Sequence, residues 1–91
     1  KVLIISDEIY ADMSFSEQDK FYPMASLTST VPVITAGGLA KRWMIPGWRV
    51  GWIFIHDRNG VLKEVKDGLI KLSQLVLGAN SLIQSCLPDL L

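Results

Sequence analysis

Three short apolar runs, each closed by polar or glycine residues, constrain this 91-residue chain more than any other feature. They cover residues 2–6, 31–36 and 50–55. In the third run both alternating sets of side chains are apolar or small, which is typical of a strand covered on both faces by helices. We therefore predict an α/β fold in which three buried strands form a mostly parallel sheet flanked by helices.

A helical pattern follows the third run. Over residues 61–77 an apolar stripe recurs at helical spacing, formed by Leu62, Val65, Leu69, Leu72 and Val76. Asn59 is a candidate N-cap and Gly78 a candidate stop signal. Another helix is predicted from Ser81, with Pro88 ending or kinking it.

The connections between these elements have their own patterns. Residues 16–30 are rich in polar side chains, which predicts an exposed connection with at most one helical turn and no chemistry. Gly37-Gly38 are predicted to end the second strand, where backbone approaches a ligand closely or adopts a positive φ. Pro46-Gly47 fits a type II turn, with glycine supplying the positive φ.

Composition indicates how much apolar surface the chain must bury, and it argues against several kinds of partner. Hydrophobic residues make up 49% of the chain, more than so small a body can hide, so residues 1–91 are expected to be a fragment of a larger domain. The nine basic residues are scattered and the formal charge is zero, which argues against nucleic acid. No apolar stretch reaches the roughly 18 residues of a membrane-spanning helix. A single Cys and a single His make a metal site improbable, and the lone Cys86 fits a reducing compartment.

Chemistry-bearing residues follow two of the predicted strands. Asp7 follows the first and Lys41 the second, and open α/β sheets bind ligands beyond the carboxyl ends of their strands. A lysine amine forms a Schiff base with a carbonyl cofactor, and pyridoxal phosphate commonly pairs that lysine with an Asp on its ring nitrogen. Arg49 offers a rigid fork for phosphate, and Tyr10 a hydroxyl for the cofactor's phenolic oxygen. The alternatives are a turn-forming Asp7, a core Tyr10 and a solvated Arg49.

These residues occur in stretches 6–13, 37–43 and 46–52, which resemble the pyridoxal-phosphate aminotransferases of fold type I. The resemblance covers nearly the whole chain and implies the large, cofactor-binding domain of that family. It implies that Lys41 is catalytic and that Asp7, Tyr10, Lys41 and Arg49 bind pyridoxal 5'-phosphate. One departure is that Gly38 and Ala40 stand where many relatives carry hydroxyl side chains that bind the phosphate.

The resemblance also implies an activity. We expect the longer parent chain to transfer the amino group of an aromatic amino acid, tyrosine, to 2-oxoglutarate, giving the 2-oxo acid and glutamate. Its partners would be these small molecules and a second copy of itself in a homodimer. A cytoplasmic location is expected, with a mitochondrial one as the alternative because a preceding segment could carry a targeting signal.

Three competing hypotheses stay open. The parent could be another aminotransferase of the same group, such as one acting on alanine. The chain could be a truncated product that binds the cofactor or a partner without turnover, and the isolated polypeptide is expected to be inactive. It could also be a free-standing α/β module in which Lys41 and Asp7 are only structural.

Overall fold

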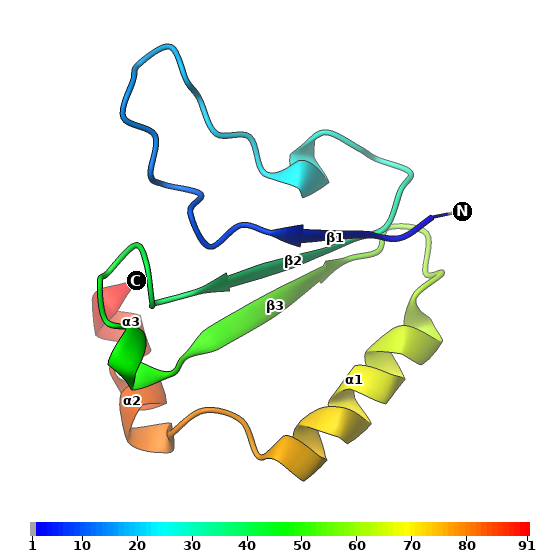
Figure 1. The fold of residues 1–91 in the computed structure, drawn as a ribbon. Helices are drawn as coiled ribbons and strands as arrows, with labels where there is room; N and C mark the ends of the chain where they lie inside the picture. The colour runs from blue at the N-terminus through cyan, green and yellow to red at the C-terminus, as the bar shows by residue number, and fades with distance from the viewer. Residues whose placement is uncertain (1) are drawn as a thin grey trace.

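The computed structural model describes residues 2–91, and its three strands form one sheet in the order β1-β2-β3 (Figure 1). The strands are β1 (Ile4–Asp7), β2 (Val33–Gly38) and β3 (Gly51–His56). β1 and β2 run parallel, whereas β3 runs antiparallel to β2, as the arrowheads in Figure 1 show. The α/β class is confirmed, and the reversed β3 is a departure from the parallel sheet that the sequence predicted.

This combination of directions collects three chain ends at one edge of the sheet. Asp7 pairs with Ala36 near the end of β2, and Gly38 at that end pairs with Gly51 at the start of β3. The carboxyl ends of β1 and β2 therefore lie beside the amino end of β3. A parallel β3 would have started at the opposite edge.

The glycine pair ends β2 as predicted, and both glycines are paired with β3 as part of the strand. Neither glycine has a positive φ. A Cβ on Gly38 would come within 2.9 Å of the Val50 carbonyl oxygen, and one on Gly37 within 2.8 Å of Trp52 Nε1. A side chain at position 38 would therefore push against the β3 backbone, and one at position 37 would displace the Trp52 ring.

Only the middle strand is well covered. The buried apolar side chains are few, and they are Val33, Ile34, Leu39, Val50 and Leu62. A single 3₁₀ turn, η1 (Met24–Ser26), interrupts the exposed connection as predicted and lies against β2. The prediction of three buried strands is wrong for β1 and β3: Ile5 is 73% exposed and Phe54 56% exposed. Within the described chain, nothing large enough covers the outer strands.

The long helix forms where the pattern predicted it, as α1 (Lys63–Val76). Asn59 is not its cap. Instead the Asp57 carboxylate accepts hydrogen bonds from the N–H groups of Val61 (3.0 Å) and Leu62 (2.7 Å), just before the first turn. The helix ends as the chain turns left-handed at Leu77 (φ 61°) and Gly78 (φ 67°).

The apolar stripe of α1 is not covered in this chain. No residue of the helix is buried, and in Figure 1 the helix lies to one side of the sheet. Of the predicted stripe, Leu62 is buried, but it precedes the helix. The amphipathic pattern therefore predicted the helix correctly but not its packing.

The last predicted helix divides in two, α2 (Ser81–Ser85) and α3 (Leu87–Leu90). The Asn80 side chain caps α2 by accepting from the N–H groups of Leu82 (2.9 Å) and Ile83 (3.3 Å). Pro88 lies in the first turn of α3, so the predicted interruption is confirmed. Among the described residues no helix has the length and apolar character to span a bilayer.

The glycine packing yields a stability test in the full-length parent. Gly38→Ala should destabilise it by roughly 1–3 kcal/mol, because the added methyl group meets β3 backbone that cannot move without breaking the pairing. Gly68→Ala is the matched control: it meets no atom within 4 Å and should raise stability by up to about 1 kcal/mol through helix propensity. Urea denaturation midpoints measure both, and equal midpoints for the two variants would contradict the packing role of Gly38.

Candidate functional site

The four residues singled out from the sequence all lie at the sheet edge where the three chain ends meet. Asp7 is the last residue of β1, and Tyr10 lies in the turn that follows it. Lys41 lies in the loop after β2, and Arg49 precedes β3. The strand directions alone bring these four positions together.

The turn after β1 is tied to the sheet and to the connection behind it. The Asp7 carboxylate accepts a hydrogen bond from the Ile9 N–H through Oδ1 at 3.2 Å. The Glu8 N–H donates to the Ala36 carbonyl at 2.9 Å, and Glu8 Oε1 accepts from the Met24 N–H at 2.8 Å. Asp7 is thus a turn-former, and it is also exposed at the sheet edge with only one of its two carboxylate oxygens used by this contact.

Lys41 and Tyr10 meet across the two segments. The Lys41 ammonium nitrogen lies 5.8 Å from the centroid of the Tyr10 ring, about the outer limit of a cation–π contact. Both side chains are exposed, so Tyr10 is not a core residue. The parallel pairing of β1 with β2 brings the segments that carry this pair to the same edge of the sheet.

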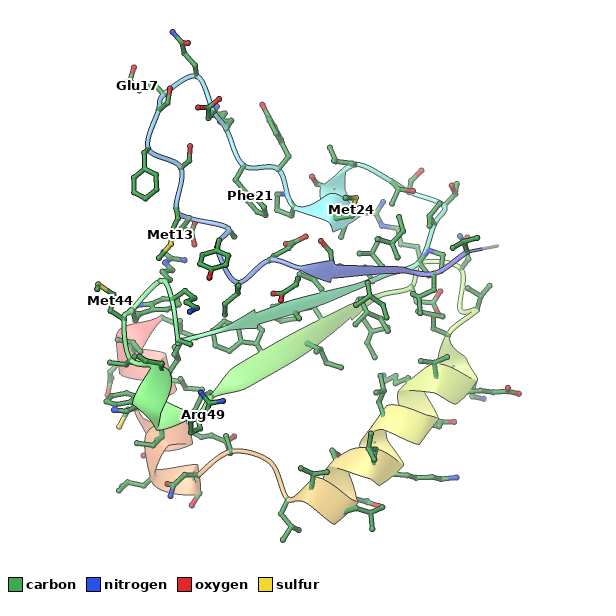
Figure 2. All side chains as sticks on the ribbon, viewed as in Figure 1. Met13, Glu17, Phe21, Met24, Met44 and Arg49 are labelled. Carbon is green, nitrogen blue, oxygen red and sulfur yellow. The ribbon has the colours of Figure 1, made fainter. Side chains whose placement is uncertain are left out.

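The loop that carries Lys41 is anchored at its base. The Leu39 side chain is fully buried, and its N–H donates to the Val50 carbonyl at 3.1 Å, so the two ends of the loop are joined. Between them the chain turns left-handed at Met44 (φ 55°), which Figure 2 shows pointing away from the sheet. The loop therefore projects Lys41 and its neighbours from a fixed base.

The loop does not contain the predicted type II turn. Pro46–Trp48 instead form a 3₁₀ turn, η2, and the positive φ falls on Arg49 (φ 53°, ψ 39°) rather than on Gly47. The Pro46 carbonyl accepts from both the Arg49 N–H (3.3 Å) and the Arg49 guanidinium (2.9 Å). These two bonds hold the arginine in a conformation that non-glycine residues rarely adopt.

Arg49 stands apart from the other three residues in one respect. Its labelled side chain in Figure 2 lies beside the start of β3, and no hydrogen bond or ion pair within residues 2–91 joins it to Asp7, Tyr10 or Lys41. The contact with Pro46 uses one of the five guanidinium N–H donors. The remaining donors are available to a ligand.

Sequence reasoning missed one interaction at this edge. Arg42 Nη1 lies 2.5 Å from Asp12 Oδ2, and the same guanidinium lies 4.5 Å from the centroid of the Trp43 ring. The sequence offered a clue to the pairing, since each partner lies one or two positions from a candidate site residue.

A hollow of 380 Å³ lies on one face of the sheet and extends to this edge, where Glu8, Asp12 and Arg42 line it. None of the four candidate residues lines it; its walls include Phe21, Thr35, Trp52, Phe54 and His56. The Thr35 hydroxyl is buried there without a hydrogen-bond partner among the described residues. In the pairing register, Asp7 aligns with Ala36, so its side chain lies on the face opposite to Thr35.

A family model for aminotransferases of class I and II matches residues 1–90. The chain belongs to the class I and II aminotransferase family. It is 58% identical over 90 residues to a tyrosine aminotransferase of Dictyostelium discoideum, covering 97% of this chain and 21% of that protein. The human tyrosine aminotransferase is 52% identical over 91 residues, covering 99% of this chain and 20% of that protein.

A solved aminotransferase structure shares the fold. The alanine aminotransferase from Pyrococcus furiosus superposes with a TM-score of 0.85 at 35% identity, covering 91% of this chain and 21% of that one. This neighbour, together with the family match, confirms the fold type I aminotransferase architecture predicted from the sequence. The chain spans about a fifth of the length of the relatives it matches.

Aminotransferases of this family use pyridoxal phosphate, and the donor set at the sheet edge fits that group. An amine, a carboxylate, a phenol and a guanidinium lie there on exposed side chains, matching an aldehyde, a ring nitrogen, a ring hydroxyl and a phosphate. Gly38 and Ala40 provide no hydroxyl groups, so Arg49 is the side chain that would hold the phosphate here. The hollow beside Thr35 is lined by neither Lys41 nor Arg49, so it lacks the amine and the guanidinium of this set.

Proposed function

We propose that this chain carries the cofactor-binding segment of a pyridoxal-phosphate-dependent aminotransferase whose parent transfers the amino group of tyrosine to 2-oxoglutarate. The aromatic donor is favoured by the relatives named tyrosine aminotransferase, at 52–58% identity. The products would be the 2-oxo acid and glutamate. We further propose that the parent works as a cytoplasmic homodimer on these small molecules.

The observation that carries the proposal is the approach of Lys41 to Tyr10 at the edge where Asp7 ends β1. A lysine that reacts with a carbonyl cofactor needs that cofactor held beside it. Asp7 and Tyr10 come from one segment and Lys41 from another, and the parallel β1–β2 pairing aligns the two. Arg49 enters from the third chain end.

Asp7, Tyr10 and Arg49 each have one task in this scheme. When bound, the cofactor supplies an aldehyde for the lysine and a ring that withdraws electrons from the substrate's Cα. The Asp7 carboxylate keeps a proton on the ring nitrogen, because a negative charge beside that nitrogen favours its protonated form. The Tyr10 hydroxyl donates to the ring oxygen, and the Arg49 guanidinium donates to the phosphate.

Lys41 has two tasks. Its amine would hold the cofactor through the aldehyde carbon, and it would also be the base that moves a proton at the substrate's Cα. Its exposed position in the loop allows it to move between these roles without disturbing a packed core. The buried Leu39 at the base of the loop limits that movement to the segment beyond it.

Alanine as the amino donor is the second candidate, favoured by the structural match to the Pyrococcus furiosus alanine aminotransferase. The higher identity to the tyrosine aminotransferases is the reason for ranking tyrosine first. A panel of amino donors, with 2-oxoglutarate and pyruvate as acceptors, separates the two. A kcat/KM for alanine above that for tyrosine would reverse the ranking.

The lysine assignment predicts where the cofactor attaches. Borohydride reduction of the full-length parent with bound pyridoxal phosphate should label Lys41, as peptide mass spectrometry would show. Lys41→Ala should lose the label and reduce turnover by at least about 10³-fold, because nucleophile and base disappear together. Lys63→Ala, on the exposed side of α1, is the control. A label on Lys20, Lys63, Lys66 or Lys71 would refute the assignment.

The carboxylate assignment predicts the effect of Asp7→Asn. The amide oxygen can still accept from the Ile9 N–H, so the turn should persist, while the negative charge beside the ring nitrogen is lost. Turnover should fall about 100-fold or more, in the range seen when one electrostatic partner of a transition state is removed. Asp67→Asn on α1 is the control. Near-normal turnover of Asp7→Asn would leave Asp7 with its turn-forming role alone.

The phosphate assignment predicts the effect of Arg49→Lys and Arg49→Ala on cofactor retention. Both replacements keep a non-glycine residue at the left-handed position, so both have a similar backbone strain energy. A difference in cofactor affinity between them therefore comes from the side chain. The dissociation constant for pyridoxal phosphate should rise roughly 10- to 100-fold for Arg49→Ala, and less for Arg49→Lys, because a charge-assisted bond contributes about 1.5–3 kcal/mol. Equilibrium dialysis measures it, and an unchanged constant in both variants would remove Arg49 from the phosphate site.

A further inference from the structure

We propose that the Asp12–Arg42 ion pair is a positioning device that fixes the Lys41 loop against the turn after β1, and so sets the distance between the lysine and the groups facing it. The inference rests on the proposed function, because it assigns the pair a role toward Lys41. Neither residue is proposed to touch the cofactor or the substrate.

The pair lies directly beside the contact it would control. Arg42 follows Lys41 in the chain, and Asp12 lies two residues beyond Tyr10. The ion pair (Nη1 to Oδ2, 2.5 Å) and the Lys41–Tyr10 contact (5.8 Å) therefore connect the same two segments side by side. A movement of the loop relative to the turn changes both distances together.

Other contacts hold each segment to the sheet but not to the other segment. The turn is fixed through Glu8, which bonds to Ala36 and Met24, and the loop is fixed at its base by the bond between Leu39 and Val50. Among residues 2–91, Arg42–Asp12 is the only ion pair. No backbone hydrogen bond in this part of the chain joins the turn at 9–13 to the loop at 40–48. Without the pair, the contact between described residues that still connects the loop to the turn is the 5.8 Å approach of Lys41 to Tyr10.

The pair is better suited to fixing geometry than to stabilising the fold. Both side chains are 53% exposed, and exposed ion pairs contribute little to the free energy of unfolding. Arg42 is, however, held from a second side by Trp43, 4.5 Å from its guanidinium carbon. A planar guanidinium fixed by stacking loses less freedom when it also pairs with a carboxylate. Small errors in the position of a catalytic group are costly, since a shift of about 1 Å can reduce turnover roughly 100-fold.

The test is a double-mutant cycle in the full-length holoenzyme, using Asp12→Asn, Arg42→Gln and the two combined. Each single change should lower kcat about tenfold with little change in KM, because a misplaced lysine impairs the proton transfer more than substrate binding. The circular dichroism of the bound cofactor should change as well, since it reports how the ring is held. The combined variant should be no worse than either single one, because one interaction can be lost only once.

Four further variants sharpen the cycle. Asp67→Asn and Arg58→Gln remove the same charges at exposed positions away from this edge and should leave kcat, the dichroism and the melting temperature unchanged. Exchanging the charges, with Asp12→Arg and Arg42→Asp together, should recover part of the lost kcat. Arg42→Lys keeps the positive charge but not the planar guanidinium, and should give an intermediate loss of kcat. If Arg42→Gln fails to fold, Arg42→Lys and Asp12→Asn together still test the inference.

Several results would overturn the inference. One is an unchanged kcat and dichroism in the single variants, and another is a strictly additive loss of kcat in the combined variant. A third is opposite shifts of the pH profile in Asp12→Asn and Arg42→Gln, which would indicate a charge effect alone. Failure of the proposed function looks different: the wild-type parent would then carry no cofactor on Lys41. A cofactor on Lys41 together with unaffected pair variants contradicts only the positioning role.

Discussion

The site depends on how β2 is paired. On one side β2 runs parallel to β1 and on the other antiparallel to β3, with Asp7 opposite Ala36 and Gly38 opposite Gly51. This arrangement brings two strand ends and one strand start to a single edge, so that a carboxylate, a lysine loop and an arginine reach it from three parts of the chain. The close pairing is possible because Gly37 and Gly38 have no side chains where Trp52 and the β3 backbone approach. A small steric feature of β2 thus determines whether the chemical groups can meet.

The two sides of the site differ in how firmly they are held. The turn after β1 is tied to β2 and η1 through Glu8, whereas the lysine loop is tied at its base by Leu39 and reaches the turn through Arg42. A nucleophile that attaches to a cofactor and then leaves it needs this kind of support, with a fixed base and a movable tip. The buried Leu39 and its bond to Val50 fix the base, and we propose that the exposed Asp12–Arg42 pair limits the movement of the tip.

Local patterns in the sequence predicted a large part of this structure. The three apolar runs, the α1 periodicity and Pro88 indicated the elements, and the order of Asp7, Tyr10, Lys41 and Arg49 placed all four candidates at one edge. The sequence did not predict the properties that depend on which segments meet in space. These are the direction of β3, the packing role of Gly38 and the Asp12–Arg42 pair. The expected burial of the outer strands and of the α1 stripe was wrong for this chain, because periodicity shows which face is apolar and not what covers it.

The left-handed backbone at Arg49 has a consequence for how this position changes under selection. An L-residue with a side chain pays roughly 1–2 kcal/mol for that conformation, a cost that glycine avoids. A library of variants sorted for folding alone should therefore enrich glycine at position 49, whereas sorting the same library for growth that depends on the parent enzyme should return arginine. The two outcomes would separate, at a single codon, what the polypeptide needs to fold from what it needs to work.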